Sequence, residues 1–435
     1  MTATTIGVIG LISLVVLILL RIPVAVALGL VGFFGYAALD GFARANLMIS
    51  GVPVEFASTY TLSVVPLFTL MGAVAASAGL SSDLFQAGRV LFRGARGSLA
   101  IASIFASAMF GAVCGSSVAT ALTMSKVSIP EMLRAKYPPA LAAGAVAAGG
   151  TLGILIPPSL ILMIYAIIAQ QSVARLFMAA LIPGIILTVL YSLTALIYYR
   201  WLTGNAPEPE YAQRQSETLV RSFARIWHVI VLFGVTLGGI YAGWFTPTEA
   251  AAIGALGAIL LGLVLGRHTL SDTFTCFFET IRLVSSLVFI VIASAVFSYF
   301  VVQTGVSNQL IGAVKGIGLD AIGVIVAVCV LYIVMGAFLE GIGMLLITVP
   351  ITLPLVLSYG YDPVWFGVLL VILIELGLIH PPMGMNLFAI NAVSKEINII
   401  DIYKGSAPFL IAPLLLIVLM IMFPQIVLWL PAQMN

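Results

Sequence analysis

The sequence predicts an all-α polytopic membrane protein, and three observations point to that fold class. Hydrophobic residues make up 62% of the chain and charged residues only 8%, whereas a soluble domain carries about 25% charged residues. Apolar runs such as Ile6–Leu20 and Ile281–Val302 are close to the roughly 20 residues that cross a bilayer. The apolar chain also divides into two similar halves. Much of the surface is therefore expected to face lipid.

One long polar stretch, residues 202–226, separates these halves. It contains two prolines and six charged residues. A composition of this kind is typical of a linker between folded segments. We therefore expect a first membrane repeat in residues 1–201 and a second in residues 227–435.

The halves match each other at a separation of 224 positions, which relates Pro157-Pro158 to Pro381-Pro382. The same separation relates further proline, tyrosine and glycine pairs, in the same order along both halves: Pro23 and Pro247, Pro130 and Pro354, Tyr137 and Tyr361, Pro139 and Pro363, Gly153 and Gly377. The alternative is that these matches are coincidences in a chain rich in apolar residues, and this becomes harder to accept with each further match in the same order. The matches predict a duplication, which is typical of secondary transporters.

Five membrane crossings are expected in the first half. Their apolar segments are 5–20, 23–40, 61–80, an interrupted segment at 140–170, and 176–200. Residues 98–136 are also apolar, but glycine, serine and proline residues divide them into two arms. Because each arm is too short to cross, we expect a re-entrant hairpin. Five crossings place the start of the second half on the opposite side, so the repeat is predicted to be inverted.

The second half is expected to follow the same plan. Its crossings are 228–245, 247–265, 283–302, an interrupted segment at 363–395, and 405–430. A second hairpin is expected at 320–360, with its tip near Gly336–Gly341. Three amphipathic stretches are expected to lie along the membrane surface: 42–58, 81–96 and 270–282.

The distribution of positive charge gives the expected orientation. If the central linker is cytoplasmic, fourteen of the 18 Lys and Arg residues fall on the cytoplasmic side, and only Arg44, Arg175 and Lys315 fall outside. Cytoplasmic loops of membrane proteins carry an excess of Lys and Arg. We therefore expect the linker in the cytoplasm and both chain termini on the opposite side.

The two hairpin tips and the two interrupted spans are the stretches that could bind an ion or a substrate. Prolines and glycines at membrane depth leave backbone groups without helical partners. Free carbonyls can then bind a small cation, and the N-termini of half-helices can face an anion. Neutral side-chain oxygens add ligands that suit sodium: Ser116, Ser117, Thr120, Thr151 and Asn386. The alternative is that proline and glycine only kink these helices.

Three ionisable residues stand in the same stretches. Glu340 lies on the second hairpin tip, where a site role is the favoured interpretation because a carboxylate at membrane depth is expensive without a function or a partner. For Glu375 two interpretations stay open, a site role and a carboxyl that is paired or protonated. His380 precedes the second Pro-Pro pair, and a structural histidine is the alternative to a ligand there.

Other classes of protein find little support. The chain has no Gly-Lys-Ser/Thr phosphate loop, no His-Glu-x-x-His and no Gly-x-Ser-x-Gly sequence, so we expect neither ATP hydrolysis nor another enzymatic activity. The net charge of +2 comes without a basic stripe, which argues against nucleic-acid binding. Cys114, Cys276 and Cys329 have unrelated spacings and are expected to pack as small apolar residues.

Four motifs together resemble the large membrane subunit, DctM type, of tripartite ATP-independent periplasmic (TRAP) transporters. They begin at Gly115, Ile154, Phe245 and Gly377 and read GSSVAT, ILIPPS, FTPTEAA and GLIHPPMGMN. The resemblance covers essentially the whole chain. It implies a sodium-coupled importer of organic acids, such as C4-dicarboxylates or related carboxylates. It also implies an elevator-type carrier in the bacterial inner membrane, with no cofactor beyond the coupling ion.

The resemblance further implies two partners: a small four-helix membrane subunit (DctQ type) and a periplasmic substrate-binding protein (DctP type). Carried over to this sequence, it implies two sodium sites and a substrate site between the hairpin tips. The first sodium site would use Ser116, Ser117, Gly149, Thr151 and Gly153. The second would use Glu340, Gly341, Gly377, His380 and Met383, and many members of the family have threonine where His380 stands. The substrate would contact Ser116, Ser117, Thr120, Glu340 and Asn386.

Two other functions remain as alternatives. One is a sodium–carboxylate symporter of similar architecture that works without partners. The other is a channel or a membrane scaffold that transports nothing.

Overall fold

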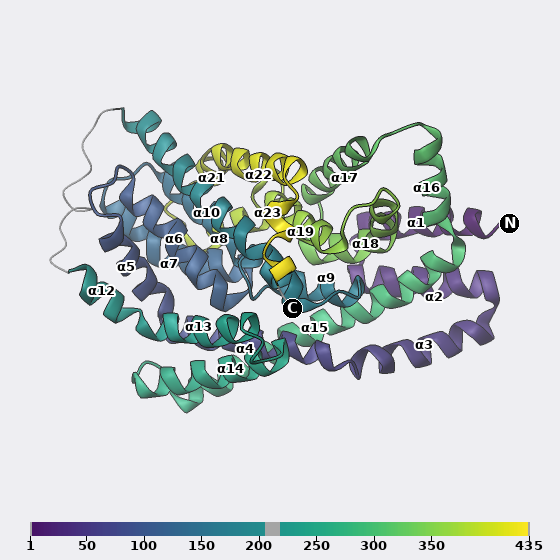
Figure 1. Cartoon of the computed structure of the whole chain (residues 1–435), viewed down its shortest axis with the longest axis horizontal. Helices are drawn as coiled ribbons and strands as arrows, with labels where there is room; N and C mark the ends of the chain where they lie inside the picture. The colour runs from purple at the N-terminus through teal and green to yellow at the C-terminus, as the bar shows by residue number, and fades with distance from the viewer. Residues whose placement is uncertain (1, 205–217, 434–435) are drawn as a thin grey trace.

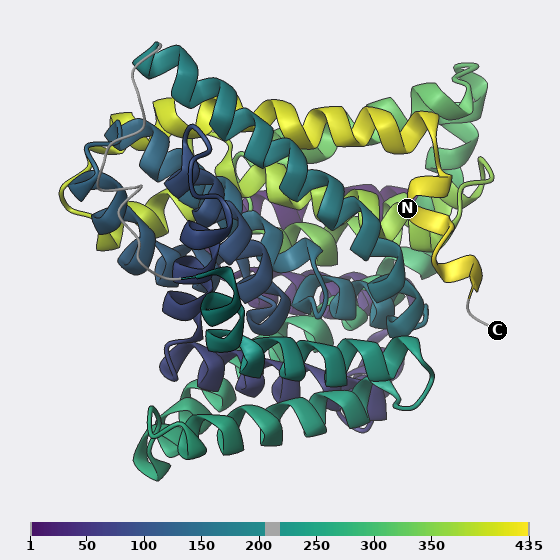
Figure 2. The ribbon, with the colours of Figure 1, turned by 60° about the vertical axis from the view of Figure 1, so that its left-hand side comes forward.

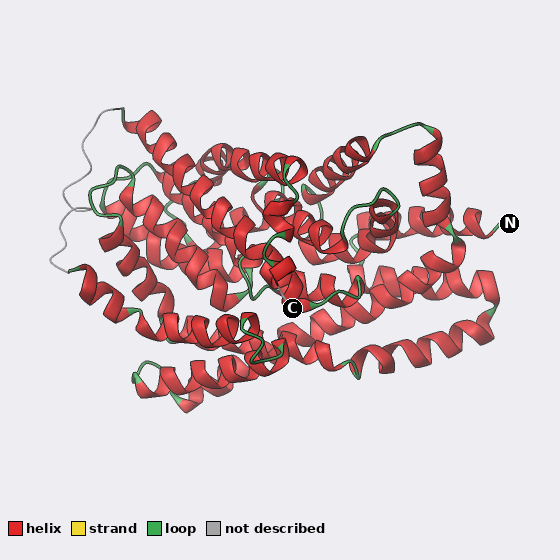
Figure 3. Ribbon diagram, viewed as in Figure 1, coloured by secondary structure: helices red, strands yellow, loops and turns green. Residues whose placement is uncertain are grey.

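The computed structural model describes residues 2–204 and 218–433, and within these ranges every regular element is a helix (Figure 3). The prediction of an all-α fold is confirmed. Residues 205–217 of the expected linker lie outside the described ranges. The described end of that linker forms α12 (Leu219–Arg225).

Most helices begin directly after glycine, proline or a polar capping residue, for example Pro23, Gly97 and Ser159. The helices before the linker are α1 (Ala3–Leu19), α2 (Val24–Asp40), α3 (Phe42–Ala57), η1 (Tyr60–Ser63), α4 (Val64–Ser77), α5 (Leu80–Leu91), α6 (Ser98–Cys114), α7 (Ser117–Arg134), α8 (Pro139–Leu155), α9 (Leu160–Ile168) and α10 (Val173–Thr203).

The helices after α12 repeat much of this order and are, along the chain, α13 (Trp227–Tyr241), α14 (Pro247–Val264), α15 (Leu270–Thr304), α16 (Val306–Gly316), α17 (Ala321–Gly336), α18 (Gly341–Leu357), α19 (Pro363–Ile379), α20 (Met385–Val393), α21 (Ile399–Ser406), η2 (Ala407–Leu410), α22 (Ile411–Met422), α23 (Gln425–Leu428) and η3 (Pro431–Gln433).

Six helical stretches in the described residues are long and apolar enough to cross a membrane: Tyr60–Ser77, Pro139–Ile168, Val173–Thr203, Pro247–Val264, Leu270–Thr304 and Ile399–Met422. Several shorter apolar helices accompany them, among them the first arm of the first expected hairpin and both arms of the second. Exposed isoleucine, leucine, valine and phenylalanine side chains cover much of the outer surface. This surface suits lipid better than water, as the composition requires.

The broken helices α8 and α19 form the centre of the molecule. Every residue of α8 from Leu141 to Leu155 is buried, and so is every residue of α19 from Val364 to Ile379. In both views α13 and α14 lie at the bottom of the molecule, while α10, α21 and α22 lie at the top (Figures 1 and 2). Helices α6, α7 and α21 pack against α8, so the middle layer is held on several sides.

The two halves agree in the lengths of their central elements. α8 and α19 each have 17 residues and start at prolines 224 positions apart, and α9 and α20 each have nine residues. Each hairpin also meets its broken helix at a glycine pair, Gly111 with Gly153 and Gly336 with Gly377. These agreements support the predicted duplication. Its inverted orientation in a membrane stays a prediction.

Two of the expected surface helices differ in the structure. Residues 270–282 do not form a separate helix, because α15 continues for 35 residues without a glycine or proline to end it. Residues 81–96 mostly form α5, which packs against α6 and buries Leu84 and Phe85 completely. An amphipathic pattern indicates one apolar face, and here that face is covered by protein.

Candidate substrate and cation sites

The first hairpin turns at Gly115 and Ser116, between α6 and α7. Gly115 ends α6 with a φ of 67°, a left-handed conformation that glycine adopts without steric cost. The Ser116 hydroxyl accepts a hydrogen bond from the Ala119 amide at 3.4 Å and caps α7. The Leu160 amide donates to the Gly115 carbonyl at 3.3 Å. The hairpin tip is therefore fixed to the start of α9, directly after the first helix break.

A small group of oxygens lies where this tip meets α8. Thr120 is fully buried, and its hydroxyl has no hydrogen-bond partner among the described residues, although the Cys114 thiol lies near it. A β-carbon built on Gly153 would lie 2.7 Å from Thr120 Oγ1 and 3.0 Å from the Ser116 carbonyl oxygen. Both oxygens therefore face one glycine. A buried oxygen without a partner is costly, and a cation ligated at this point would satisfy it.

Asn386 joins the first hairpin to the second half of the chain. It is fully buried at the start of α20. Its Oδ1 accepts a hydrogen bond from the Ser117 hydroxyl at 3.1 Å, and its Nδ2 donates to Ser117 Oγ at 2.8 Å and to the Ala147 carbonyl at 3.2 Å. The structure thus shows a bridge between α20, α7 and α8. Contacts of Ser117 and Asn386 with a substrate stay predictions.

Two other residues of the expected first sodium site face different neighbours. The Thr151 hydroxyl donates to the Ala148 carbonyl at 2.8 Å and lies 3.1 Å from the Tyr191 hydroxyl of α10. A β-carbon on Gly149 would meet Ser107 of α6 at 2.7 Å. The structure therefore brings Ser116, Thr120 and Gly153 together, and it places Thr151 on the α10 side of α8.

Glu375 occupies the position on α19 that corresponds to Thr151 on α8. It is fully buried, and neither carboxylate oxygen has a hydrogen-bond partner among the described residues. Tyr191 lies within electrostatic range of it. The interpretation of Glu375 as a paired carboxyl therefore finds no hydrogen-bonded partner among the described residues.

The second hairpin tip carries Glu340 at the N-terminus of α18. Its carboxylate accepts hydrogen bonds from the Ile342 and Gly343 amides, each at 3.2 Å, so it caps the helix and complements its dipole. A cavity of about 180 Å³ lies beside it. Four residues of the expected second sodium site contribute to its lining: Glu340, Gly341, Gly377 and Met383. His380 ends α19 nearby and is absent from that lining.

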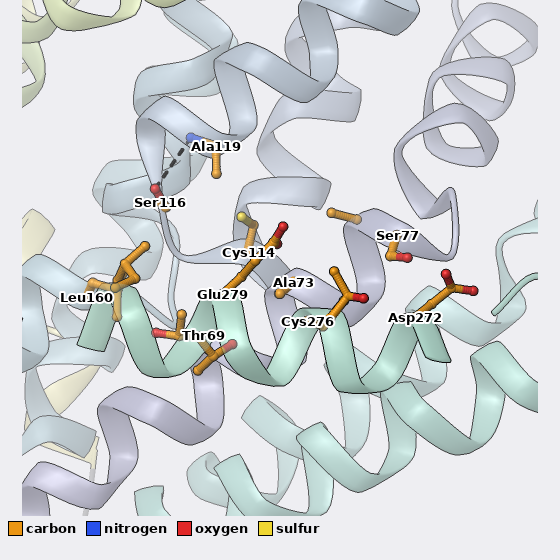
Figure 4. Close-up of a pocket in the computed structure, with 15 residues that line it drawn as sticks. Thr69, Ala73, Ser77, Cys114, Ser116, Ala119, Leu160, Asp272, Cys276 and Glu279 are labelled. Atoms are coloured by element: carbon orange, nitrogen blue, oxygen red, sulfur yellow. Dashed lines mark hydrogen bonds between the residues drawn. The ribbon is translucent and has the colours of Figure 1, made fainter. Parts of the chain in front are cut away.

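A larger cavity, of about 420 Å³, opens at the first tip (Figure 4). α4 contributes Thr69 and Ser77, the hairpin contributes Cys114 and Ser116, and the first half of α15 closes the opposite side. Polar side chains thus contribute to the lining, and one of them, Ser116, is a candidate cation ligand. The cavity connects the hairpin to helices far from it in sequence.

Sequence reasoning missed the side of this cavity that α15 forms. Asp272, Cys276 and Glu279 line it, and their spacing of four and then three residues places them on one helix face. That periodicity was the available signal. It identifies a face but not the hairpin, more than 150 residues earlier, that the face meets.

A second cavity, of about 490 Å³, lies near the other end of α15. Its lining includes Glu55, Gln170, Gln171 and Tyr299. The first and second halves of α15 thus each border a cavity that polar side chains help to line.

Replacing Asn386 with leucine is expected to loosen the first tip. Leucine has a similar volume but leaves the Ser117 hydroxyl and the Ala147 carbonyl without the amide, which costs about 1–3 kcal/mol. The purified protein should therefore unfold several degrees lower in a thermal denaturation experiment. Asn391→Leu is the matched control, because Asn391 lies on the same helix but is exposed. Equal unfolding temperatures for the two variants would show that the bridge contributes no stability.

Long apolar helices, paired helix breaks and cavities beside the two hairpin tips are typical of a multi-pass membrane transport protein. Residues 11–426 match the family described as "Tripartite ATP-independent periplasmic transporter, DctM component". The chain therefore belongs to this family, as its motifs predicted. Membership implies a tripartite system with a small permease subunit and a periplasmic binding protein.

Curated relatives agree with this assignment. The C4-dicarboxylate TRAP transporter large permease protein DctM of Pseudomonas aeruginosa is 33% identical and covers 87% of each chain. The sialic acid protein SiaM of Vibrio cholerae is 31% identical over 89% of this chain and 88% of its own. The ectoine/5-hydroxyectoine protein UehC of Ruegeria pomeroyi is 31% identical over 96% and 97%. These relatives are transporter subunits, so the prediction that the chain is not an enzyme is confirmed.

Two solved structures share the fold. The YdaH transporter of Alcanivorax borkumensis superimposes with a TM-score of 0.57 at 16% identity, over 88% of this chain and 89% of its own. MtrF of Neisseria gonorrhoeae superimposes with a TM-score of 0.58 at 17% identity, over 87% and 84%. At such low identity the likeness concerns the fold alone.

Proposed function

We propose that this chain is the transport subunit of a sodium-coupled, binding-protein-dependent importer of organic acids. The observation that carries the proposal is the buried, unpartnered Thr120 hydroxyl, which faces Gly153 together with the carbonyl oxygen of Ser116, a residue that also lines the cavity at the first tip. These ligands are neutral, and neutral oxygens suit a monovalent cation. The substrate would be a C4-dicarboxylate or a related carboxylate.

The charge of the cavity supports coupling to a cation. None of the described residues that line it is Lys, Arg or His. A substrate carboxylate at the tip therefore finds no fixed positive charge. Sodium ions bound beside it would supply that charge, and the substrate and ions would then stabilise each other's binding.

The packing supports an elevator mechanism. α2 packs along α15, and α4 packs along α14 and α15, which together would form a frame. The hairpins and broken helices pack mainly among themselves around α8 and α19 and would form the moving body. The hairpin tips, where the substrate would bind, belong to this moving body. Its displacement would therefore carry the substrate from one side of the membrane to the other.

The partners and the orientation complete the proposal. A small four-helix subunit and a periplasmic binding protein would assemble with this chain in the bacterial inner membrane, with the linker in the cytoplasm and both termini periplasmic. Exposed apolar side chains such as Phe34 and Leu47 form a surface that a helical partner or lipid would cover. The binding protein would deliver the substrate to the periplasmic side.

Uptake into proteoliposomes tests the proposal. With both partners present, a sodium gradient is expected to drive uptake of one member of a panel of C4-dicarboxylates, sugar acids, keto acids and ectoine. Replacing sodium by potassium should reduce the initial rate to background. Uptake at the full rate without sodium would contradict the coupling. Undiminished uptake after omission of both partners would favour the symporter that works alone.

A further inference from the structure

The cavity at the first hairpin tip has an uneven charge. Two carboxylates, Asp272 and Glu279, line it, and its described lining contains no cationic side chain. Asp272 is committed to the start of α15, because its Oδ2 accepts hydrogen bonds from the Thr269 amide at 2.9 Å and from the Thr269 hydroxyl at 2.7 Å. Glu279 lies nearly two turns further along the same helix and is available to a ligand.

Glu279 reaches into the cavity. Figure 4 shows its side chain extending from α15 toward Cys114, at the end of α6 and next to the hairpin turn. The residue is exposed and forms no hydrogen bond or ion pair with any described residue. Its carboxylate therefore faces the place where a bound substrate would lie, from the side opposite the hairpin.

A second polar group also points to a ligand. Thr280 is only 5% exposed and lines the same cavity, and its hydroxyl has no hydrogen-bond partner among the described residues. Ser116 and Thr69 add hydroxyls to the lining. The cavity thus offers hydroxyl groups for hydrogen bonds with a ligand, and its negative charge lies only on the side that α15 forms.

This arrangement discriminates between solutes. A dicarboxylate bound through one carboxylate at the hairpin tip would direct its other carboxylate toward Glu279, and like charges at close range oppose binding. A solute with a positive group at that end would instead form an ion pair in a cavity that the protein partly encloses, where such pairs are stronger than in bulk water.

We propose that the solute carried by this protein is a zwitterion, with one carboxylate bound at the first hairpin tip and one ammonium or amidinium group bound by Glu279. The proposal rests on the function proposed above and narrows its substrate class. No covalent step is involved. Glu279 is thereby a specificity-determining residue that belongs to the fixed frame, whereas the carboxylate site belongs to the hairpin.

Three ligands with the same four-carbon chain test the proposal. Succinate, 4-hydroxybutyrate and 4-aminobutyrate share a carboxylate at one end of the chain, and the group at the other end is negative, neutral or positive, respectively. Thermal unfolding of the complete membrane complex in sodium buffer reports their binding without the selectivity of the binding protein. Glu279→Gln removes the charge, and Glu396→Gln is the control, because Glu396 is exposed and lines neither polar cavity.

The wild-type complex is expected to bind 4-aminobutyrate about fivefold more tightly than 4-hydroxybutyrate, and succinate most weakly, as partly exposed ion pairs allow. Glu279→Gln should remove this order, and Glu396→Gln should preserve it. Equal or tighter binding of succinate by the wild type would overturn the proposal, as would an unchanged order in Glu279→Gln or the absence of any stabilisation by 4-aminobutyrate. If the order holds but uptake needs no sodium, the sodium coupling fails and the zwitterion proposal stands.

Discussion

Replacing Gly153 with alanine is expected to reduce sodium-driven uptake by about tenfold or more. The new β-carbon would lie 2.7 Å from Thr120 Oγ1 and 3.0 Å from the Ser116 carbonyl oxygen. It would enter the space in front of the two oxygens that we assign to a cation. Forcing an extra carbon into such packing costs about 1–3 kcal/mol, and each 1.4 kcal/mol corresponds to a factor of ten in binding. Initial uptake rates at several sodium concentrations would show the loss.

Two further variants separate a lost ligand from a general steric fault. Gly238→Ala adds the same carbon to another apolar helix, at a position where it would meet no atom within 4 Å, and should leave uptake intact. Thr120→Val removes the hydroxyl without adding volume and should raise the sodium concentration needed for half-maximal uptake. An unchanged sodium dependence in both Gly153→Ala and Thr120→Val would place the coupling ion elsewhere.

The hairpin turn and the helix breaks were predictable because glycine and proline act locally. Gly115 adopts a backbone conformation that other residues avoid, and each Pro-Pro pair stands at the end of a 17-residue helix. A glycine in the left-handed conformation or a Pro-Pro pair ends a helix here, whereas the single prolines Pro130 and Pro183 lie inside α7 and α10. The same reasoning explains α15. Residues 270–282 were expected to form a separate surface helix, but the segment contains no glycine or proline that would end a helix before residue 283.

The choice of site residues could only partly be predicted. Residues 149, 151 and 153 of α8 alternate in sequence, and on a helix this spacing directs Thr151 away from the face that Gly149 and Gly153 share. The sequence did not show which face meets the hairpin. Asn386 was expected to offer a neutral oxygen because of its residue type, and the structure shows it bound to Ser117 across a separation of 269 positions. Glu279 was invisible for the same reason, because long-range packing decides which distant surfaces form a cavity.

The packing of α8 against α21 shows how strictly the two halves depend on each other. A β-carbon on Gly405 of α21 would overlap the Ala140 carbonyl oxygen of α8, and a β-carbon on Gly144 would overlap the Gly405 carbonyl oxygen. Both obstacles are backbone atoms, which cannot turn aside as the end of a side chain can. The two helices therefore touch backbone to backbone, as small residues permit in membrane proteins.

Gly405→Ala is accordingly expected to be the most destabilising single-carbon change in this contact. Separation of α8 from α21 would disturb the helix that carries Gly153 and Ala147, so both stability and uptake should fall. We expect a loss of about 1–3 kcal/mol or more, visible as a lower unfolding temperature and a smaller monodisperse fraction in size-exclusion chromatography. Gly312→Ala is the control, because Gly312 lies in α16 with no atom within 4 Å of a new β-carbon. Alanine favours a helix over glycine by up to about 1 kcal/mol, so this control should unfold at the same or a slightly higher temperature. If Gly405→Ala behaved in the same way, the two helices would not be in backbone contact, and α8 would not be held between the halves as described.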